Sequence, residues 1–300
     1  MHKITFFPLG NADTNLIELN NGKHILIDYA NMGDASDDDD NRIDLPDALK
    51  NTLGEKESID VVVFTHIDTD HIKGSHDFFN FLHADKYQSD DRIDIEEMWV
   101  PAAALVEEGA DDEPRVVRQE ARYRFQQGTG IKVFSTPNQL HDWAEDSGIN
   151  LDHKKDLIVN AGETIDDFSL HVDGIEIFVH SPFAHRTEED KLIDRNKDAI
   201  ALNIKFQVAG TETLFSTFSD LGSNEINDIV GISESYGNSD RLSWDIFKIP
   251  HHCSHISLDE VTAEDFEEPQ ENVDRLYQEY SNEGPLIISS SKPIKRHDSD

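Results

Sequence analysis

Val61-Val-Val-Phe-Thr-His-Ile-Asp-Thr-Asp-His-Ile-Lys-Gly-Ser75 runs from three β-branched residues into a loop rich in histidine and aspartate. The valines predict a buried strand, and Gly74 before a cluster of apolar residues predicts a helix soon after. One strand-to-helix loop therefore carries four potential metal ligands, namely His66, Asp68, Asp70 and His71. Strand alternation sends the first three to a common side, and the turn brings His71 beside them. Such a cluster is costly to desolvate without cations among its carboxylates, so the loop predicts a metal site.

Length and cysteine content limit the kinds of protein that this chain can be. A chain of 300 residues can bury one substantial core, and an α/β domain of this size needs no second domain. We therefore expect a single domain over residues 1–300. The one cysteine, Cys253, excludes an intrachain disulfide and any multi-cysteine zinc cluster, so His, Asp and Glu must hold a metal.

The composition also argues against a membrane protein. No apolar run approaches the length of a membrane span, and the first ten residues lack the long apolar region of a signal peptide. We therefore expect a cytoplasmic protein with no membrane partner. The formal net charge of −36 opposes nonspecific approach to nucleic acid, although physiological salt screens charges beyond about 8 Å. This charge argues against a processive nuclease but permits a local cationic site.

The motif HIDTDH at residues 66–71 resembles the HxHxDH signature of the metallo-β-lactamase-fold hydrolases. Asp68 stands where the commonest form has a second histidine. The HxDxDH form is similar to the branch that contains the hydrolase domain of the competence DNA-uptake channel ComEC. A strand end with a few solvated polar residues is the alternative, and four ligand-type residues in six positions make it the weaker interpretation.

Two further strand ends carry the resemblance. Strands expected at about residues 4–9, 15–19 and 23–29 are similar to the first sheet of that fold, and the last ends in Asp28. The resemblance implies that Asp28 supports the metal loop without binding metal. A later strand, at residues 174–179, is followed by His180, for which the resemblance implies the role of third imidazole in the first metal site. A histidine that caps a strand is the alternative.

The second half of the chain ends in two more such motifs. The strand at residues 213–219 ends in Ser219-Asp220, where the family carries Gly-Asp and that aspartate bridges both metals. Residues 244–257 resemble the ending LKxPHHGSxxS, with Cys253 in place of glycine. One of His251 and His252 is expected to bind metal and the other to face the reacting group, and the sequence does not decide which. For Cys253 we favour a small packed thiol over a nucleophile.

The fold class that the resemblance implies is α/β, a metallo-β-lactamase αββα sandwich of two mixed sheets with outer helices. We expect residues 102–156 to be a mostly helical insertion that covers the site. Within it, three arginines fall on one face of a helix, and an ordinary solvated helix is favoured over a contact to substrate phosphate. These arginines are Arg115, Arg118 and Arg122.

The resemblance implies two divalent metal ions. It assigns one to His66, Asp68 and His180, and the other to Asp70, His71 and one histidine of the 251–252 pair, with Asp220 between the two. Two such ions about 3.5–4 Å apart activate a bridging hydroxide and hold both attacking and leaving oxygens. Zn²⁺ is the default, and the carboxylate of Asp68 makes Mn²⁺ or Mg²⁺ more plausible than at an all-histidine site.

The reaction class is hydrolysis, and we expect a phosphodiester substrate, possibly nucleic acid. Lys248 and the spare histidine would neutralise an oxyanion and protonate a leaving group, although Lys248 equally suits an ordinary strand-edge lysine. The net charge favours a small or single-stranded phosphodiester over long duplex. A lactone or thioester hydrolase on the same metals is one alternative. A noncatalytic regulatory module that retains the fold is another.

Overall fold

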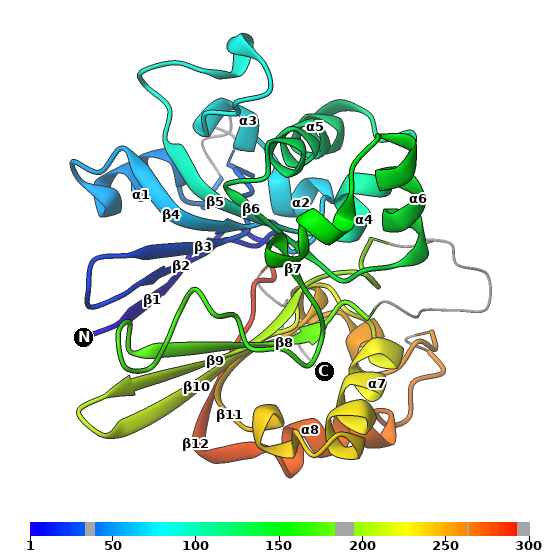
Figure 1. Ribbon diagram of the computed structural model, residues 1–300. Helices are drawn as coiled ribbons and strands as arrows, with labels where there is room; N and C mark the ends of the chain where they lie inside the picture. The colour runs from blue at the N-terminus through cyan, green and yellow to red at the C-terminus, as the bar shows by residue number, and fades with distance from the viewer. Residues whose placement is uncertain (34–39, 184–194, 263, 293–300) are drawn as a thin grey trace.

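Two β-sheets pack face to face at the centre of the molecule, and helices cover their outer faces (Figure 1). The computed structural model describes residues 1–33, 40–183, 195–262 and 264–292. The first sheet has seven strands in sequence order: β1 (Lys3–Phe6), β2 (Asn15–Glu18), β3 (His24–Ile27), β4 (Ser58–Val63), β5 (Asp94–Pro101), β6 (Ile131–Phe134) and β7 (Ile158–Val159). Strands β1 to β3 pair antiparallel and β3 to β7 pair parallel, so this sheet is mixed.

The second sheet is also mixed. Its order is β12 (Ser281–Ile288), β11 (Trp244–Lys248), β10 (Thr211–Thr217), β9 (Ala201–Val208) and β8 (Ile175–Ser181). Strands β8, β9 and β10 pair antiparallel, whereas β10, β11 and β12 pair parallel. Because parallel neighbours end at the same edge of a sheet, the loops after β10 and β11 leave the sheet side by side.

Helices flank the sandwich on both sides (Figure 1). The first sheet carries α1 (Leu45–Leu53), α2 (Thr69–Ile72), α3 (Ser75–Phe78), α4 (Ala102–Val106), α5 (Asp112–Gln127) and α6 (Asn138–Asp146). The second carries α7 (Ser223–Ser235) and α8 (Glu271–Gln278). Short 3₁₀ helices are η1 (Asp85–Tyr87), η2 (Leu151–His153), η3 (Lys155–Leu157), η4 (Ser239–Leu242), η5 (His251–Cys253) and η6 (His255–Ser257). None of the described helices has the length and apolar character needed to cross a membrane.

The valine run of β4 is buried on both faces, which explains why it does not alternate with polar residues. Val61 and Val63 belong to the core between the two sheets. Val62 points the other way and packs in the core between the first sheet and its helices. Complete burial of such a side chain is worth about 1.5–3 kcal/mol, so this strand anchors the loop that follows it.

The αββα arrangement predicted from the sequence is confirmed. The segment 102–156 contains α4, α5, α6, the short η2 and the beginning of η3, and also strand β6, which pairs in parallel with both β5 and β7. This strand belongs to the seven-stranded sheet, which the sequence analysis did not anticipate. That the segment is an insertion remains a prediction.

Two of the three arginine side chains on α5 are not simply solvated, as we had expected, but contact another helix. Nη1 of Arg118 donates a hydrogen bond to the carbonyl of Glu107 (2.6 Å), and Nε of Arg122 donates to the carbonyl of Leu105 (2.6 Å). These carbonyls lie at the C-terminal end of α4, where a helix has no internal donors for them. The two arginines therefore join α5 to α4.

Candidate metal centre

Segments far apart in the sequence meet at one edge of the sandwich. The loop and helix α2 after β4 carry Asp70 and His71, Asp220 follows β10, and His252 lies in η5 after β11. The loops after β10 and β11 are joined directly, because the backbone N–H of His251 donates to the carbonyl of Ser219 (3.0 Å). The topology thus places functional side chains from both sheets at one point.

Four of these side chains form a group that could hold a metal ion, which we call the metal cluster: Asp70, His71, Asp220 and His252. Their ligand atoms all lie within 4.8 Å of one another. Nε2 of His252 is 3.1 Å from Oδ2 of Asp70 and 3.2 Å from Oδ2 of Asp220. Nε2 of His71 lies 3.2 Å from Oδ1 of Asp220. The arrangement offers two imidazoles and two carboxylates to one cation.

Asp28 holds His71 from behind. Its carboxylate accepts hydrogen bonds from Nδ1 of His71 (2.8 Å) and from both the backbone N–H and the hydroxyl of Thr65 (2.7 Å each). All three residues are buried. A proton on Nδ1 of His71 satisfies Asp28 and leaves Nε2 as a lone-pair donor toward the metal cluster.

His252 is supported in a similar way from the opposite side. Its Nδ1 lies 3.3 Å from the hydroxyl of Ser290 and 3.8 Å from Oδ1 of Asp13. The backbone of His252 is in the left-handed region, with φ of 51°. These contacts turn Nε2 toward Asp70 and Asp220, so the structure selects His252 from the 251–252 pair as the member of the metal cluster.

The charges of the metal cluster fit a cation at its centre. Nε2 of His71 and Oδ1 of Asp220 are buried and have no hydrogen-bond partner in the described part of the chain. Burial opposes a charge on His71, but the carboxylates of Asp220 and Asp28 outweigh it and raise the pKa well above its usual value. Burial likewise opposes the charge on Asp220, yet His71 and His252 hold its pKa well below the usual range. Imidazole and carboxylate are ligands that Zn²⁺ and Mn²⁺ accept.

His66 and Asp68, expected to hold a first metal, lie outside the metal cluster. His66 is buried, and its Nδ1 lies 3.3 Å from the hydroxyls of Thr65 and Ser219. Its Nε2 is 3.7 Å from Oδ2 of Asp68. The other oxygen of Asp68 accepts a hydrogen bond from Nη1 of Arg195 (2.6 Å), so the carboxylate already has a cationic partner.

His180 points away from the site, in contrast to the expectation that it supplies a third imidazole. Its Nε2 lies 3.0 Å from the carbonyl of Arg241, and its Nδ1 lies 3.4 Å from the hydroxyl of Ser233. Strand alternation explains this difference. Val179 packs in the core between the sheets, so its neighbour His180 emerges on the opposite face of β8, toward α7.

Lys248 also differs from both interpretations that the sequence allowed. It ends β11, an inner strand of the second sheet, so it is not a strand-edge lysine. Its side chain is 1% exposed, and its Nζ forms a buried ion pair with Oδ2 of Asp13. A buried, paired ammonium cannot meet a substrate oxyanion. Because Asp13 also lies beside His252, Lys248 acts on the site by fixing that aspartate.

The turn after β11 carries three consecutive residues with positive φ: His251 (51°), His252 (51°) and Cys253 (66°). His251 is half-buried, its ring centroid is 6.4 Å from that of His252, and its Nδ1 has no hydrogen-bond partner among the described residues. Cys253 is exposed, so the expectation of a packed thiol was wrong. The resembled motif has glycine at this position, which suits the backbone that the structure shows.

Sequence reasoning missed several supporting residues. Asp13, Thr65, Ser219 and Ser290 are single polar residues without a motif of their own, and each acquires its partner only in the fold. Ser219 offered one signal, because it stands where the resembled motif has glycine. It adopts φ of 49°, and its hydroxyl lies 2.7 Å from that of Thr65.

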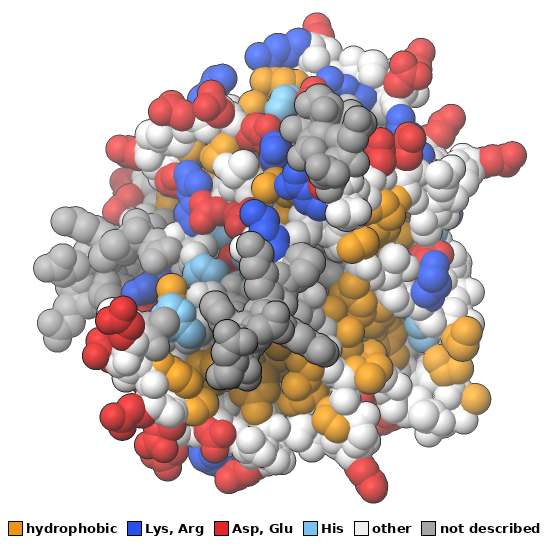
Figure 2. All heavy atoms as spheres, turned by 180° about the vertical axis from the view of Figure 1, so that it is seen from behind, with side chains coloured by type: hydrophobic (Ala, Val, Ile, Leu, Met, Phe, Trp, Pro, Cys, Tyr) orange, Lys and Arg blue, Asp and Glu red, His pale blue; other side chains and the backbone are white. Residues whose placement is uncertain are grey.

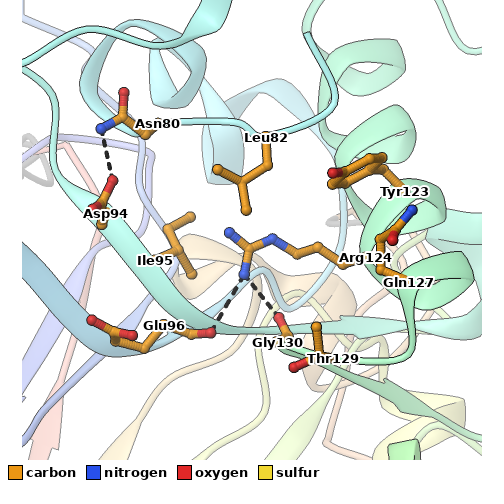
Figure 3. Close-up of a pocket in the computed structure, with 10 residues that line it drawn as sticks. All are labelled: Asn80, Leu82, Asp94, Ile95, Glu96, Tyr123, Arg124, Gln127, Thr129 and Gly130. Carbon is orange, nitrogen blue, oxygen red and sulfur yellow. Dashed lines mark hydrogen bonds between the residues drawn. The ribbon is translucent and has the colours of Figure 1, made fainter. Parts of the chain in front are cut away.

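Two cavities lie elsewhere, and no member of the metal cluster lines either. One, of about 440 Å³, surrounds Arg124, whose Nη1 donates to the carbonyls of Glu96 and Gly130 (Figure 3). The guanidinium is also paired with Glu120 (2.6 Å). The other, of about 710 Å³, has the apolar side chains of Phe178 and Ile232 in its wall.

Comparisons with known proteins give a fold likeness only. No protein-family model and no curated protein matches the chain. A class B3 di-zinc metallo-β-lactamase from an Alaskan soil metagenome is 13% identical, covering 92% of this chain and 89% of that one, with a TM-score of 0.39. A diphosphatase of the PhnP family is 14% identical, covering 83% and 74%, with a TM-score of 0.34. The metallo-β-lactamase FEZ-1 of Legionella gormanii is 14% identical, covering 92% and 88%, with a TM-score of 0.38. At these scores the likeness carries no argument about residue roles or substrate.

Proposed function

We propose that this chain is a metal-dependent hydrolase of phosphodiesters that holds a divalent metal with the metal cluster. One observation carries the proposal: four ligand side chains from three separate segments converge on one point. Among them, Nε2 of His71 and Oδ1 of Asp220 are buried, have no hydrogen-bond partner in the described chain and lie 3.2 Å apart. A divalent ion supplies Lewis acidity toward water and a phosphoryl oxygen. We propose Zn²⁺ first and Mn²⁺ or Mg²⁺ as alternatives, because imidazoles and carboxylates share the donor set equally.

The remaining residues of the site position the ligands and move protons. Asp28 fixes the ring of His71, and the pair Asp13–Lys248 stands behind His252. His251, next to the metal cluster and without a partner at Nδ1 in the described chain, is the group that we assign to protonate the leaving oxygen. Each of the two imidazole ligands thus has a support of its own.

The phosphodiester assignment rests on the HxDxDH and HHC motifs, which resemble the competence-type branch, and on charge. A net charge of −36 works against long duplex nucleic acid, whose binding needs many cationic contacts. The charge is not uniform, however. Figure 2 shows a face on which histidine, lysine and arginine side chains gather beside acidic ones. We therefore propose a short single-stranded nucleic acid or a small phosphodiester as the substrate.

A substrate panel tests this function. The purified protein, loaded with Zn²⁺ or Mn²⁺, is assayed on bis(p-nitrophenyl) phosphate, short single-stranded DNA and RNA, cyclic nucleotides, a lactone and a thioester. We expect phosphodiester turnover that Asp70→Ala abolishes and that Asp77→Ala, which removes a mostly exposed carboxylate from α3, leaves unchanged. Turnover of only the lactone or thioester would show that the same metal centre acts on another class of substrate. Absence of bound metal would indicate a noncatalytic module.

A further inference from the structure

We infer that the metal centre holds one metal ion, and that the guanidinium of Arg195 takes the place of the second cation that the family resemblance implies. The inference rests on the proposed function, because it concerns the composition of the same site. It also departs from that resemblance, since the donors that the resemblance assigns to the other ion, His66, Asp68 and His180, do not come together.

Arg195 is held by two carboxylates beside the metal loop. Its Nη1 donates to Oδ1 of Asp68 (2.6 Å) and to the carbonyl of Ile67 (3.3 Å). Its Nε and Nη2 donate to the two oxygens of Glu107 at 2.8 and 2.5 Å. This two-pronged contact is the geometry that the planar guanidinium favours and that a lysine cannot reproduce. Arg195 therefore has a fixed position, with its charge directed at Asp68.

This ion pair removes a ligand from the expected first metal site. One oxygen of Asp68 is engaged by Arg195, and the other lies 3.7 Å from Nε2 of His66. His180, the third ligand expected there, has both ring nitrogens directed at partners near α7. Of the three side chains assigned to that ion alone, only the imidazole of His66 and one oxygen of Asp68 remain. Zinc sites usually take three or four protein ligands, so a second ion would depend on sharing Asp220 with the first.

Charge leads to the same conclusion. The metal cluster contributes two carboxylates, Asp70 and Asp220, which offset the charge of one divalent ion. A second ion near Asp68 would stand against the guanidinium of Arg195, which keeps its proton at any pH at which the protein is folded. A second metal ion would also offset the charge of its carboxylate ligand Asp68, and the fixed guanidinium of Arg195 already does so.

The experiment counts metal ions. The full chain is stripped with a chelator, dialysed against a small excess of Zn²⁺, and its zinc content per chain is measured by elemental analysis. Separately, the spectrum of bound Mn²⁺ is recorded by electron paramagnetic resonance. We expect one zinc per chain and the signal of isolated Mn²⁺. We expect Asp68→Asn to keep one ion and His252→Ala to lose it, with thermal melts to confirm that both variants fold.

The outcomes separate this inference from the proposed function. Two zinc ions per chain, one of them lost in Asp68→Asn, or the signal of a coupled Mn²⁺ pair, would overturn the one-metal centre while leaving a metal hydrolase intact. No bound metal at all would overturn both. One ion that Asp68→Asn removes would place the metal on Asp68 and also overturn the inference. Asp77→Asn, which removes the charge of a mostly exposed carboxylate on α3, is the matched control.

Discussion

Oδ2 of Asp28 accepts a hydrogen bond from Nδ1 of His71, 2.8 Å away, and joins two buried residues that are 43 positions apart in the sequence. The contact fixes which ring nitrogen of His71 faces the metal cluster, and it links the first sheet to helix α2. A metal ligand held in this way has its orientation set before the ion arrives.

Asp28→Asn is expected to weaken metal binding about 10–100-fold, because the amide no longer attracts the proton on Nδ1 of His71. Competition between the protein and a chromogenic zinc chelator measures the affinity. Asp142→Asn, on the exposed side of α6, serves as the matched loss of one charge. An affinity within a factor of two of the original chain for Asp28→Asn would contradict the role given to Asp28.

The buried pair Asp13–Lys248 predicts a large effect on stability. Lys248→Met leaves the carboxylate of Asp13 buried without its counter-charge, which costs about 3–5 kcal/mol. Urea unfolding measures the loss. The comparison is Lys205→Met, whose ion pair with Glu212 lies at the surface and is worth less than about 1 kcal/mol. Equal losses in the two variants would argue against a buried ion pair.

The metal-free protein should lose stability as the pH rises. Burial opposes the charge on His252, but hydrogen bonds to Asp220 and Asp70 outweigh it and raise its pKa from 6.5 to about 9. A pKa raised in the folded state contributes stability that is complete below pH 6.5 and disappears as the pH rises through about 9. Thermal melts of chelator-treated protein between pH 6 and 9.5 should show this decline.

Metal binding should change this dependence, because the ion displaces the proton from His252. We expect the affinity for Zn²⁺ to rise between pH 6.5 and 9, and binding to release protons into a weakly buffered solution. A pH-independent affinity over that range would show that His252 does not bind the ion. His141, an exposed histidine on α6, provides a matched control as His141→Ala.

The sequence predicted the fold class because its strongest local signals agree with the three-dimensional structure. The valine run is buried on both faces of β4, and the ligands follow at its carboxyl end. Strand β6 was missed because it has only four residues. It lies between helices, and the helical pattern of their sequences dominates that segment.

The ligand set was harder to predict, because side-chain direction depends on register and on long-range partners. The irregular register near the end of β8 and the alternation along that strand place His180 on the outer face, which its sequence position does not reveal. The partner of Asp68 is Arg195, 127 residues away, and no local pattern connects the two. The choice between His251 and His252 depends on a turn with positive φ, and the sequence shows only that glycine is missing from it.

The last prediction concerns Cys253, which stands where the resembled motif has glycine. Cys253 has φ of 66° and an exposed side chain, so it bears the steric cost of a left-handed backbone and gains no burial in return. Such a conformation costs a residue with a Cβ about 1–2 kcal/mol, whereas glycine adopts it freely. The greater conformational entropy of glycine in the unfolded chain reduces this gain in stability by about 0.4–1 kcal/mol. Cys253→Gly should therefore raise the free energy of unfolding by up to about 1.5 kcal/mol in urea titrations.

Cys253→Ala separates the backbone effect from the loss of the thiol, because alanine removes the sulfur and keeps the Cβ. The strain argument requires the alanine variant to match the original chain while the glycine variant gains stability. Equal gains in both variants would instead assign the effect to the thiol. The same turn carries His252, so the metal content of Cys253→Gly is also informative. We expect the number of bound metal ions to stay unchanged. A loss of metal would mean that the restricted backbone of Cys253 is needed to hold His252 against Asp70 and Asp220.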